Sequence, residues 1–208
     1  MSRRSQYLIL SAVAVVAAAL GVAAARWSTA PVGPEHALLL EAPRELPAFS
    51  LVDHHGRPFE LASLSGRWTL VFFGFTHCPD VCPSTLFTLK QVSESLADLA
   101  EQDRPAVVMI SVDPGRDTPE KLASYVPYFD PEFIGVTGDM PQIMSLTKAM
   151  GVAFAYTPLT DGGEGYSVDH TASIFLLDPQ GRLAAIFGTP HAAERIVGDY
   201  RRVLEARG

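Results

Sequence analysis

The sequence predicts an α/β fold in which a central mixed sheet is flanked by helices. Three observations support this prediction. Short apolar, β-branched runs alternate with segments whose apolar residues recur every three or four positions. A turn sequence near the C-terminus joins two apolar runs, and 48% of the 208 residues are hydrophobic, which is enough for one buried core. Strands that alternate with helices and end in a hairpin and a helix are typical of an α/β sandwich.

The expected strands are short and strongly apolar. The run from Trp68 to Phe75 is aromatic and β-branched, as expected of a buried central strand. Near the C-terminus, the turn sequence 178–181 separates two apolar runs and predicts a hairpin. A further short apolar run covers 133–136. The expected strands are 49–52, 68–75, 107–112, 173–177 and 183–187.

Helices are expected after three of these runs and at the C-terminus. One begins at about Pro83, a helix-start signal. Its apolar residues recur at helical spacing: Leu86, Leu89, Val92, Leu96 and Leu99. Thr118, as cap, and Pro119, at the first helical position, open a second helix. A third covers about 140–150 and ends at Gly151. The last covers about 192–206.

The N-terminal segment predicts a membrane anchor. The run from Tyr7 to Ala25 carries no charge and, at 1.5 Å per residue, reaches about 28 Å as a helix, close to the thickness of a bilayer core. Arg3 and Arg4 precede it, so the positive-inside rule places the remainder across the membrane. The predicted division is therefore an anchor (1–26), a flexible tether (27–47) and a folded domain (48–208), with the domain in the periplasm or an equivalent exported space. The alternative is a signal peptide cleaved at 23–25, which exports the domain as well.

Charge and cysteine content narrow the possible functions. The net charge is −7, and no basic cluster occurs, which argues against a nucleic-acid partner. The two cysteines, Cys78 and Cys82, lie in one short segment, where a bridge would constrain little of the chain. The pair therefore indicates chemistry rather than structural cross-linking.

The position of the two cysteines allows two kinds of chemistry. They lie where a buried strand meets a helix, and the partial positive charge of a helix N-terminus favours thiolates. A thiolate is both a nucleophile and a metal ligand. Thiol-disulfide oxidoreductases of the thioredoxin type use two intervening residues, whereas here there are three. Residues four apart lie on one helix face, so both sulfurs can point at one centre, and a disulfide also stays possible.

His170 is the candidate third ligand. It precedes the expected strand 173–177, at an expected loop position where functional residues concentrate. Two thiolates and an imidazole are a soft set that suits copper(I), whereas zinc would require a fourth ligand. A single histidine before a strand is more often structural, so this pattern alone leaves the assignment open.

The segment Cys78–Pro83, taken with Val168–Thr171, resembles the motifs of the Sco/SenC family. The stretches 111–120 and 175–179 are similar to that family too, and the likeness extends from about residue 49 to the C-terminus. The resemblance implies a thioredoxin-like fold and a copper ion held by the two motif cysteines and the motif histidine. In this sequence those residues are Cys78, Cys82 and His170.

The resemblance also implies a function. Sco proteins are copper metallochaperones that help to assemble the dinuclear copper site of cytochrome c oxidase. The expected partners are the copper-binding subunit of the oxidase and an upstream copper donor. The alternative is a thiol-disulfide reductase that keeps the cysteines of that subunit reduced, and a copper or redox sensor is a third hypothesis. His170 favours the metallochaperone, because disulfide exchange requires no imidazole there.

Other polar residues near the motifs are weaker candidates. His77 adjoins Cys78, but adjacent side chains at a strand end usually diverge. Asp80 is expected in a turn, and Asp169 could orient His170 by a hydrogen bond. His54 and His55 are expected to be solvated in a polar turn.

Overall fold

The computed structural model describes residues 12–21, 34–158 and 165–207. Residues 12–21 form a helix, and the rest of the predicted anchor lies outside the described residues. Within the described ranges, no helix combines the length and the apolar character needed to cross a membrane. The predicted anchor therefore stays a prediction.

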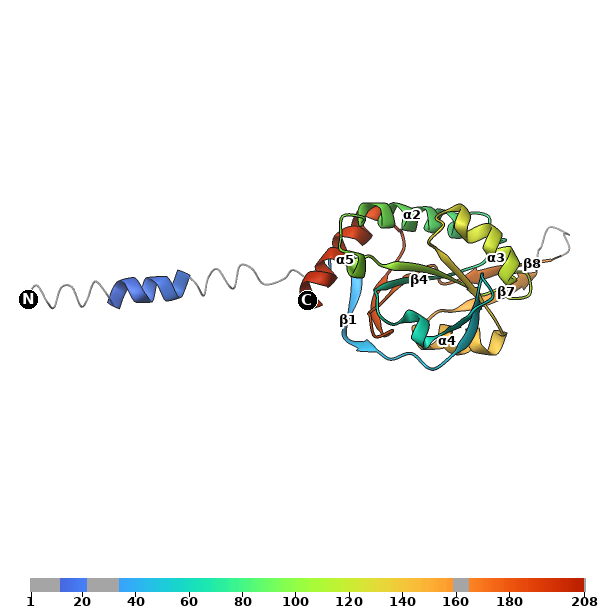
Figure 1. Cartoon of the computed structure of the whole chain (residues 1–208), viewed down its shortest axis with the longest axis horizontal. Coiled ribbons are helices and arrows are strands. Elements are labelled where there is room, and N and C mark those ends of the chain that lie inside the picture. The colour runs from blue at the N-terminus through green and yellow to red at the C-terminus, as the bar shows by residue number, and fades with distance from the viewer. Residues whose placement is uncertain (1–11, 22–33, 159–164, 208) are drawn as a thin grey trace, which may run out of the picture.

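The folded region is built on one eight-stranded mixed sheet (Figure 1). Its strands lie in the order β1-β10-β9-β4-β5-β6-β2-β3. Strand β4 pairs with β5 in parallel and with β9 in antiparallel orientation, and β5 pairs with β6 in parallel, which confirms the predicted mixed sheet. The strands are β1 (Ala37–Arg44), β2 (Ser50–Asp53), β3 (Pro58–Glu60), β4 (Thr69–Gly74), β5 (Ala106–Ser111), β6 (Ile134–Thr137), β9 (Ile174–Leu177) and β10 (Leu183–Phe187).

Helices cover both faces of this sheet. Figure 1 shows α2 and α5 packed on one face and α4 on the opposite face. The helices are α2 (Val81–Ser95), α3 (Pro119–Tyr125), α4 (Met140–Met150) and α5 (Ala193–Arg207). Short 3₁₀ turns lie at η1 (Leu61–Leu64), η2 (Glu101–Asp103) and η3 (Val126–Tyr128). The predicted α/β arrangement is thus confirmed.

The hydrophobic core is formed by the residues that the apolar sequence patterns predict to be buried. All six residues of β4 are buried, as expected of a central strand. The apolar residues that recur at helical spacing along α2, and Leu96 at its C-cap, are fully buried. Thr118 caps α3 by accepting a hydrogen bond from the backbone N–H of Lys121. Gly151 ends α4 in the left-handed conformation, with φ of 74°.

The predicted tether needs a correction, because residues 37–44 form strand β1. This strand pairs antiparallel with β10 and extends the sheet at its edge. The backbone at the start of β1 is fixed by the buried carboxylate of Asp199 on α5. This carboxylate accepts hydrogen bonds from the backbone N–H groups of Glu35, His36 and Ala37 at 2.6–2.7 Å. The folded region therefore includes part of the segment that composition assigned to a linker.

A second correction concerns a hairpin that the sequence did not predict. Strands β7 (Phe154–Pro158) and β8 (Tyr166–His170) form a separate two-stranded antiparallel sheet. In the described residues these strands pair only with each other. His170 is the last residue of β8 and so lies in a strand, not in the expected loop.

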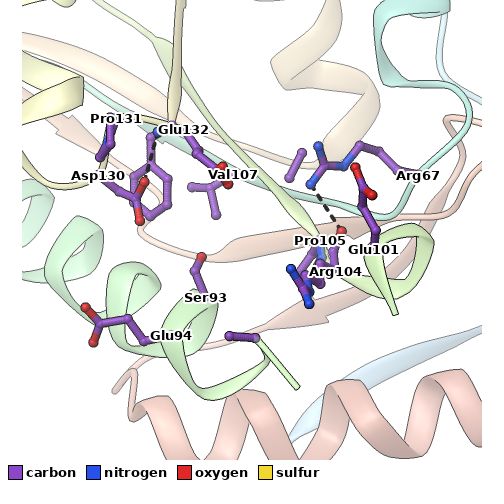
Figure 2. Close-up of a pocket in the computed structure, with 13 residues that line it drawn as sticks. Arg67, Ser93, Glu94, Glu101, Arg104, Pro105, Val107, Asp130, Pro131 and Glu132 are labelled. Atoms are coloured by element: carbon purple, nitrogen blue, oxygen red, sulfur yellow. Dashed lines mark hydrogen bonds between the residues drawn. The ribbon is translucent and has the colours of Figure 1, made fainter. Parts of the chain in front are cut away.

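One surface groove lies at the end of the sheet opposite to the cysteines. Its volume is about 720 Å³, and it is lined by residues at the start of β5 and at the C-terminal end of α2, among others (Figure 2). Arg67 donates a hydrogen bond across it to the carbonyl of Arg104 at 3.2 Å. Neither cysteine nor His170 contributes to its lining.

We expect the Asp199→Ala substitution to lower the free energy of unfolding by roughly 2 kcal/mol, because three backbone N–H groups lose a charged acceptor. Urea unfolding measures the change. Asp98→Ala is the matched control, since that exposed carboxylate pairs with Arg201 at the surface and its loss should leave the midpoint nearly unchanged. Equal midpoints for both variants would contradict the assigned role of Asp199.

Candidate metal centre

The two cysteines lie at the junction between β4 and α2. Cys78 is half-buried in the connecting loop, and Cys82 is fully buried in the first turn of the helix. A side chain at Gly74, the last residue of β4, would lie 3.2 Å from the Cys82 sulfur. The absence of a side chain there lets the Cys82 sulfur pack against the end of the strand.

The structure brings His170 to the same place. The sulfurs of Cys78 and Cys82 and a ring nitrogen of His170 all lie within 4.8 Å of one another. The sulfur of Cys82 is 3.4 Å from His170 Nε2. Three residues separated by up to 92 positions thus converge on one point, as the sequence predicts.

The His170 ring is oriented by its surroundings. Its Nδ1 lies 3.0 Å from the carbonyl oxygen of Thr171. A carbonyl can only accept, so a hydrogen bond here places the proton on Nδ1 and leaves the Nε2 lone pair facing the sulfurs. The rings of Phe72 and Phe75 pack against the imidazole at steep angles, with centroids 6.0 Å and 5.8 Å away. Nε2 is therefore available as a metal ligand.

The two thiols differ in acidity. A hydrogen bond from the Cys82 thiol, helped by the backbone N–H groups of Cys82 and Asp80 and by His170, lowers the pKa of Cys78 to about 5. The same hydrogen bond, together with burial, raises the pKa of Cys82. Only Cys78 has the lowered pKa that the helix position predicts for both. In the metal-free protein, these directions favour a thiolate at Cys78 and a protonated thiol at Cys82.

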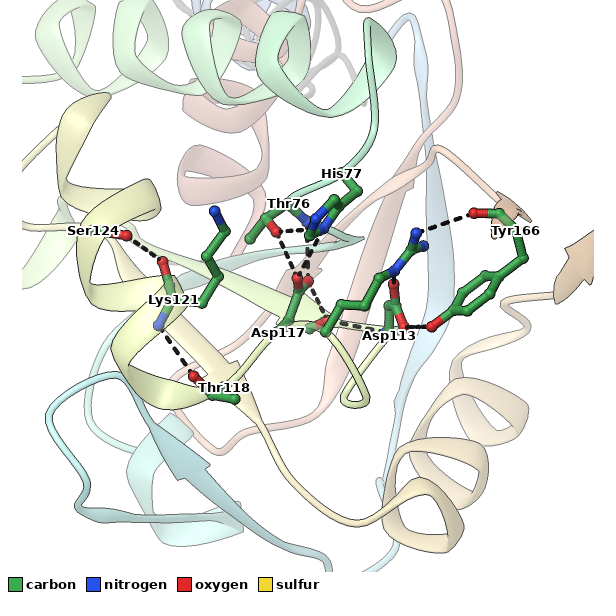
Figure 3. A network of polar contacts seen from close by, with 10 residues as sticks. Thr76, His77, Asp113, Asp117, Thr118, Lys121, Ser124 and Tyr166 are labelled. Atoms are coloured by element: carbon green, nitrogen blue, oxygen red, sulfur yellow. Dashed lines mark hydrogen bonds and ion pairs between the residues drawn. The ribbon is translucent and has the colours of Figure 1, made fainter. Parts of the chain in front are cut away.

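A buried carboxylate supports the loop that carries Cys78. Asp117 is fully buried and accepts hydrogen bonds from the backbone N–H of Thr76 at 3.0 Å, its hydroxyl at 2.6 Å and the Ser111 hydroxyl at 2.7 Å (Figure 3). His77 Nδ1 lies 4.0 Å from the same carboxylate. Sequence reasoning missed Asp117, although the stretch 111–120 was part of the family resemblance.

The weaker candidates lie outside the cluster of donor atoms. The His77 ring is directed at Thr76 and Asp117 rather than at the sulfurs. Asp169 accepts a hydrogen bond from Thr157, so its carboxylate braces the hairpin and not the His170 ring. His54 is buried and accepts from the backbone N–H of Gly135 at 2.8 Å, contrary to the expectation that it is solvated.

The fold and this cluster define a class: a thioredoxin-like protein with two sulfurs and one imidazole at the strand–helix junction. The SCO1/SenC family matches residues 39–205. The chain belongs to the SCO1/SenC family.

Named relatives extend this finding. A Stutzerimonas stutzeri protein with copper binding in its name is 42% identical over 154 residues, which are 74% of each chain. The mouse mitochondrial SCO2 homolog is 42% identical over 160 residues, which are 76% of this chain but 62% of that protein. The match thus spans less than two thirds of the mouse relative.

Solved structures show the same fold. The copper-bound ScoI structure of Arabidopsis thaliana is similar with a TM-score of 0.71 and 32% identity, covering 76% of this chain and 98% of that one. The copper-bound ScoI of Bradyrhizobium japonicum has a TM-score of 0.66 and 38% identity, covering 75% and 97%.

We expect Cys78 to react with iodoacetamide first. The thiolate is the reactive form, so the rate should rise as pH increases through about 5 and level off above it. Mass spectrometry after timed quenching locates the label. In the Cys78→Ser variant, the buried Cys82 should react far more slowly. A rate for Cys78 that rises only near pH 8 to 9, the range of an ordinary thiol, would contradict the assigned acidity.

Proposed function

We propose that this protein is a copper metallochaperone that binds one copper ion through Cys78, Cys82 and His170. The observation that carries the proposal is the convergence of the three donor atoms within 4.8 Å. The copper is cargo: it is received from one protein and passed to another. Copper-bound structures of related proteins and a relative with copper binding in its name support this choice of metal.

The donor set suits copper(I). Two thiolates and one imidazole form a soft, low-coordinate site, whereas structural zinc takes four ligands. In the part of the chain that the structure describes, the cluster holds these three donors and no carboxylate. Binding copper replaces the proton that Cys82 carries in the free protein, so uptake should release a proton.

The exposure of the site suits metal transfer. Cys82 is fully buried, while Cys78 is half-buried and lies in a loop. An incoming thiolate can therefore approach the metal from the side of Cys78 and replace the protein's ligands one at a time. Family membership supports the copper-binding subunit of cytochrome c oxidase as the recipient and an upstream copper protein as the donor.

One observation favours a second function, thiol-disulfide reduction. A half-exposed thiolate of low pKa beside a buried, protonated thiol is the arrangement of an attacking cysteine and its resolving partner. Under this hypothesis Cys78 attacks a disulfide of the oxidase subunit, and Cys82 then displaces the reduced subunit, leaving a Cys78–Cys82 disulfide. His170 takes no covalent part in those steps.

We also propose that the domain is exported and anchored to the membrane by its N-terminal segment. The uncharged run from Tyr7 to Ala25, preceded by Arg3 and Arg4, supports this location. In bacteria it corresponds to a single span of the inner membrane, with the domain in the periplasm.

The reduced full-length chain should retain one copper ion after dialysis, and the chain oxidised to a Cys78–Cys82 disulfide should retain none, because the disulfide removes both thiolate ligands. Elemental analysis measures the stoichiometry. Preferential retention of zinc, or equal copper retention after oxidation, would contradict the ligand assignment.

The His170→Ala variant separates the two functions. It should bind copper(I) at least about 100-fold more weakly, beyond the range typical for loss of a group outside the coordination sphere, and still exchange disulfides at a nearly unchanged rate. Chelator competition and a thiol-exchange assay measure the two properties, and thermal unfolding checks that the variant folds. If it loses copper yet restores oxidase activity in cells that lack the protein, the reductase function takes precedence.

A periplasmic reporter tests the location. Alkaline phosphatase fused after Gly208 should be active in cells that express the full chain, because the charge pattern exports the C-terminal domain. The matched fusion that lacks residues 1–26 should be inactive. Activity of the second fusion equal to the first would argue against this orientation.

A further inference from the structure

In the part of the chain that the structure describes, the hairpin that carries His170 has no strand partner in the main sheet. Strands β7 and β8 pair with each other across Phe154–His170 and Pro158–Tyr166. A two-stranded hairpin by itself is marginally stable in water. The residues 171–173 join His170 to β9 of the main sheet. Beyond that connection, the position of His170 depends on side-chain contacts that dock the hairpin on the rest of the domain.

The docking contacts converge on one loop, residues 112–117, which follows β5. The Tyr166 hydroxyl donates to Asp113 at 2.7 Å, and Arg116 donates to the carbonyl of Tyr166 at 3.0 Å (Figure 3). The Arg116 guanidinium also lies 3.9 Å from the centroid of the Tyr166 ring. On the paired strand, the Tyr156 hydroxyl donates to the carbonyl of Val112 at 2.6 Å.

Arg116 is itself held in place. Its guanidinium forms an ion pair with Asp113, whose side chain is 1% exposed. The tyrosine hydroxyl and the guanidinium thus share one buried carboxylate, so loss of either leaves a buried charge with fewer partners. Such a network favours a single geometry of the hairpin.

A second line of contact runs from Arg116 to the imidazole. The guanidinium lies 5.8 Å from the centroid of the Phe75 ring, and that ring packs against His170 with centroids 5.8 Å apart. Phe75 is 2% exposed, so its ring has little freedom to move. Arg116 therefore borders both the outer end of the hairpin and the aromatic wall of the site.

The same loop also supports the cysteine side of the site. Asp117 holds Thr76, two residues before Cys78, by two hydrogen bonds. Residues 112–117 thus contact both segments that must meet for three donors to converge. We propose that this loop aligns the metal centre, with Arg116 as a positioning residue that places His170 through Tyr166 and Phe75. This inference rests on the proposed copper function.

The test measures copper(I) affinity of the reduced full-length chain by competition with a chromophoric chelator. Arg116→Ala should weaken binding about 10- to 100-fold, the range for groups that orient a metal ligand. Tyr166→Phe, which removes one hydroxyl, should weaken binding less, and Arg116→Lys should restore only part of the loss, because lysine lacks the planar guanidinium. Arg182→Ala is the matched control: Arg182 pairs with the buried Asp178 in another turn, and its loss should leave the affinity unchanged.

A second background shows whether Arg116 acts through His170. In His170→Ala, adding Arg116→Ala should cause no further loss of affinity, because the ligand that it positions is gone. A merely structural role would weaken binding equally in both backgrounds and would overturn the proposal, as would wild-type affinity in Arg116→Ala. If that variant does not fold, Tyr166→Phe in the two backgrounds decides.

A measurement on the metal-free protein separates this inference from the proposed function. In the metal-free protein, the ring-proton NMR signals of His170 should be shifted by Phe72 and Phe75, and Arg116→Ala should move them toward solvent-exposed values. If wild-type protein binds no copper, the proposed function fails, and the NMR result still decides the role of Arg116. Unchanged His170 signals in the variant would refute the positioning role.

Discussion

The parallel pairing of β4 with β5 is the constraint on which the metal centre depends. Parallel neighbours end at the same edge of a sheet, so the loop that carries Cys78 and the loop 112–117 emerge side by side. Asp117 can then accept hydrogen bonds from Thr76 across the two loops. The Ser111 hydroxyl at the end of β5 donates a further hydrogen bond to the same carboxylate. A buried carboxylate is costly unless it is fully hydrogen-bonded, so this contact favours one arrangement of the cysteine loop.

The asymmetry between the two thiols follows from their different surroundings. Cys82 is fully buried against Gly74, and burial disfavours a second negative charge beside the Cys78 thiolate. Cys78 is half-exposed and receives hydrogen bonds from neighbouring N–H groups. The same pair can therefore serve as metal ligands when copper displaces the proton of Cys82, or as an attacking and a resolving thiol when a disulfide is present. Only His170 distinguishes the two chemistries.

His170 is positioned by a different part of the fold from the one that positions Cys78 and Cys82. Cys82 lies on helix α2, and Cys78 lies in the short loop between the buried strand β4 and that helix. The histidine lies on a hairpin that joins β9 at one end and is docked at the other by tyrosine and arginine contacts. Residues 112–117 contact both supports, so this loop links the two parts of the site.

Much of the fold could be predicted because local patterns agree with it: the buried run at β4, the periodic α2, the capped α3 and the turn between β9 and β10. The convergence of Cys78, Cys82 and His170 could also be predicted, because the motifs resemble those of a known family.

Strand β1 could not be predicted, since an edge strand next to prolines has the composition of a linker until β10 and Asp199 supply its partners. Other features depend on residues that are distant in the chain. They are the hairpin β7–β8, the separation of the two thiol pKa values, and the roles of Asp117 and Arg116. The sequence by itself determined which residues are candidates for the chemistry, because residue type sets ligand softness and nucleophilicity. Only the tertiary structure decided which thiol ionises and what holds the histidine, because burial and hydrogen bonding arise from neighbours that the fold brings together.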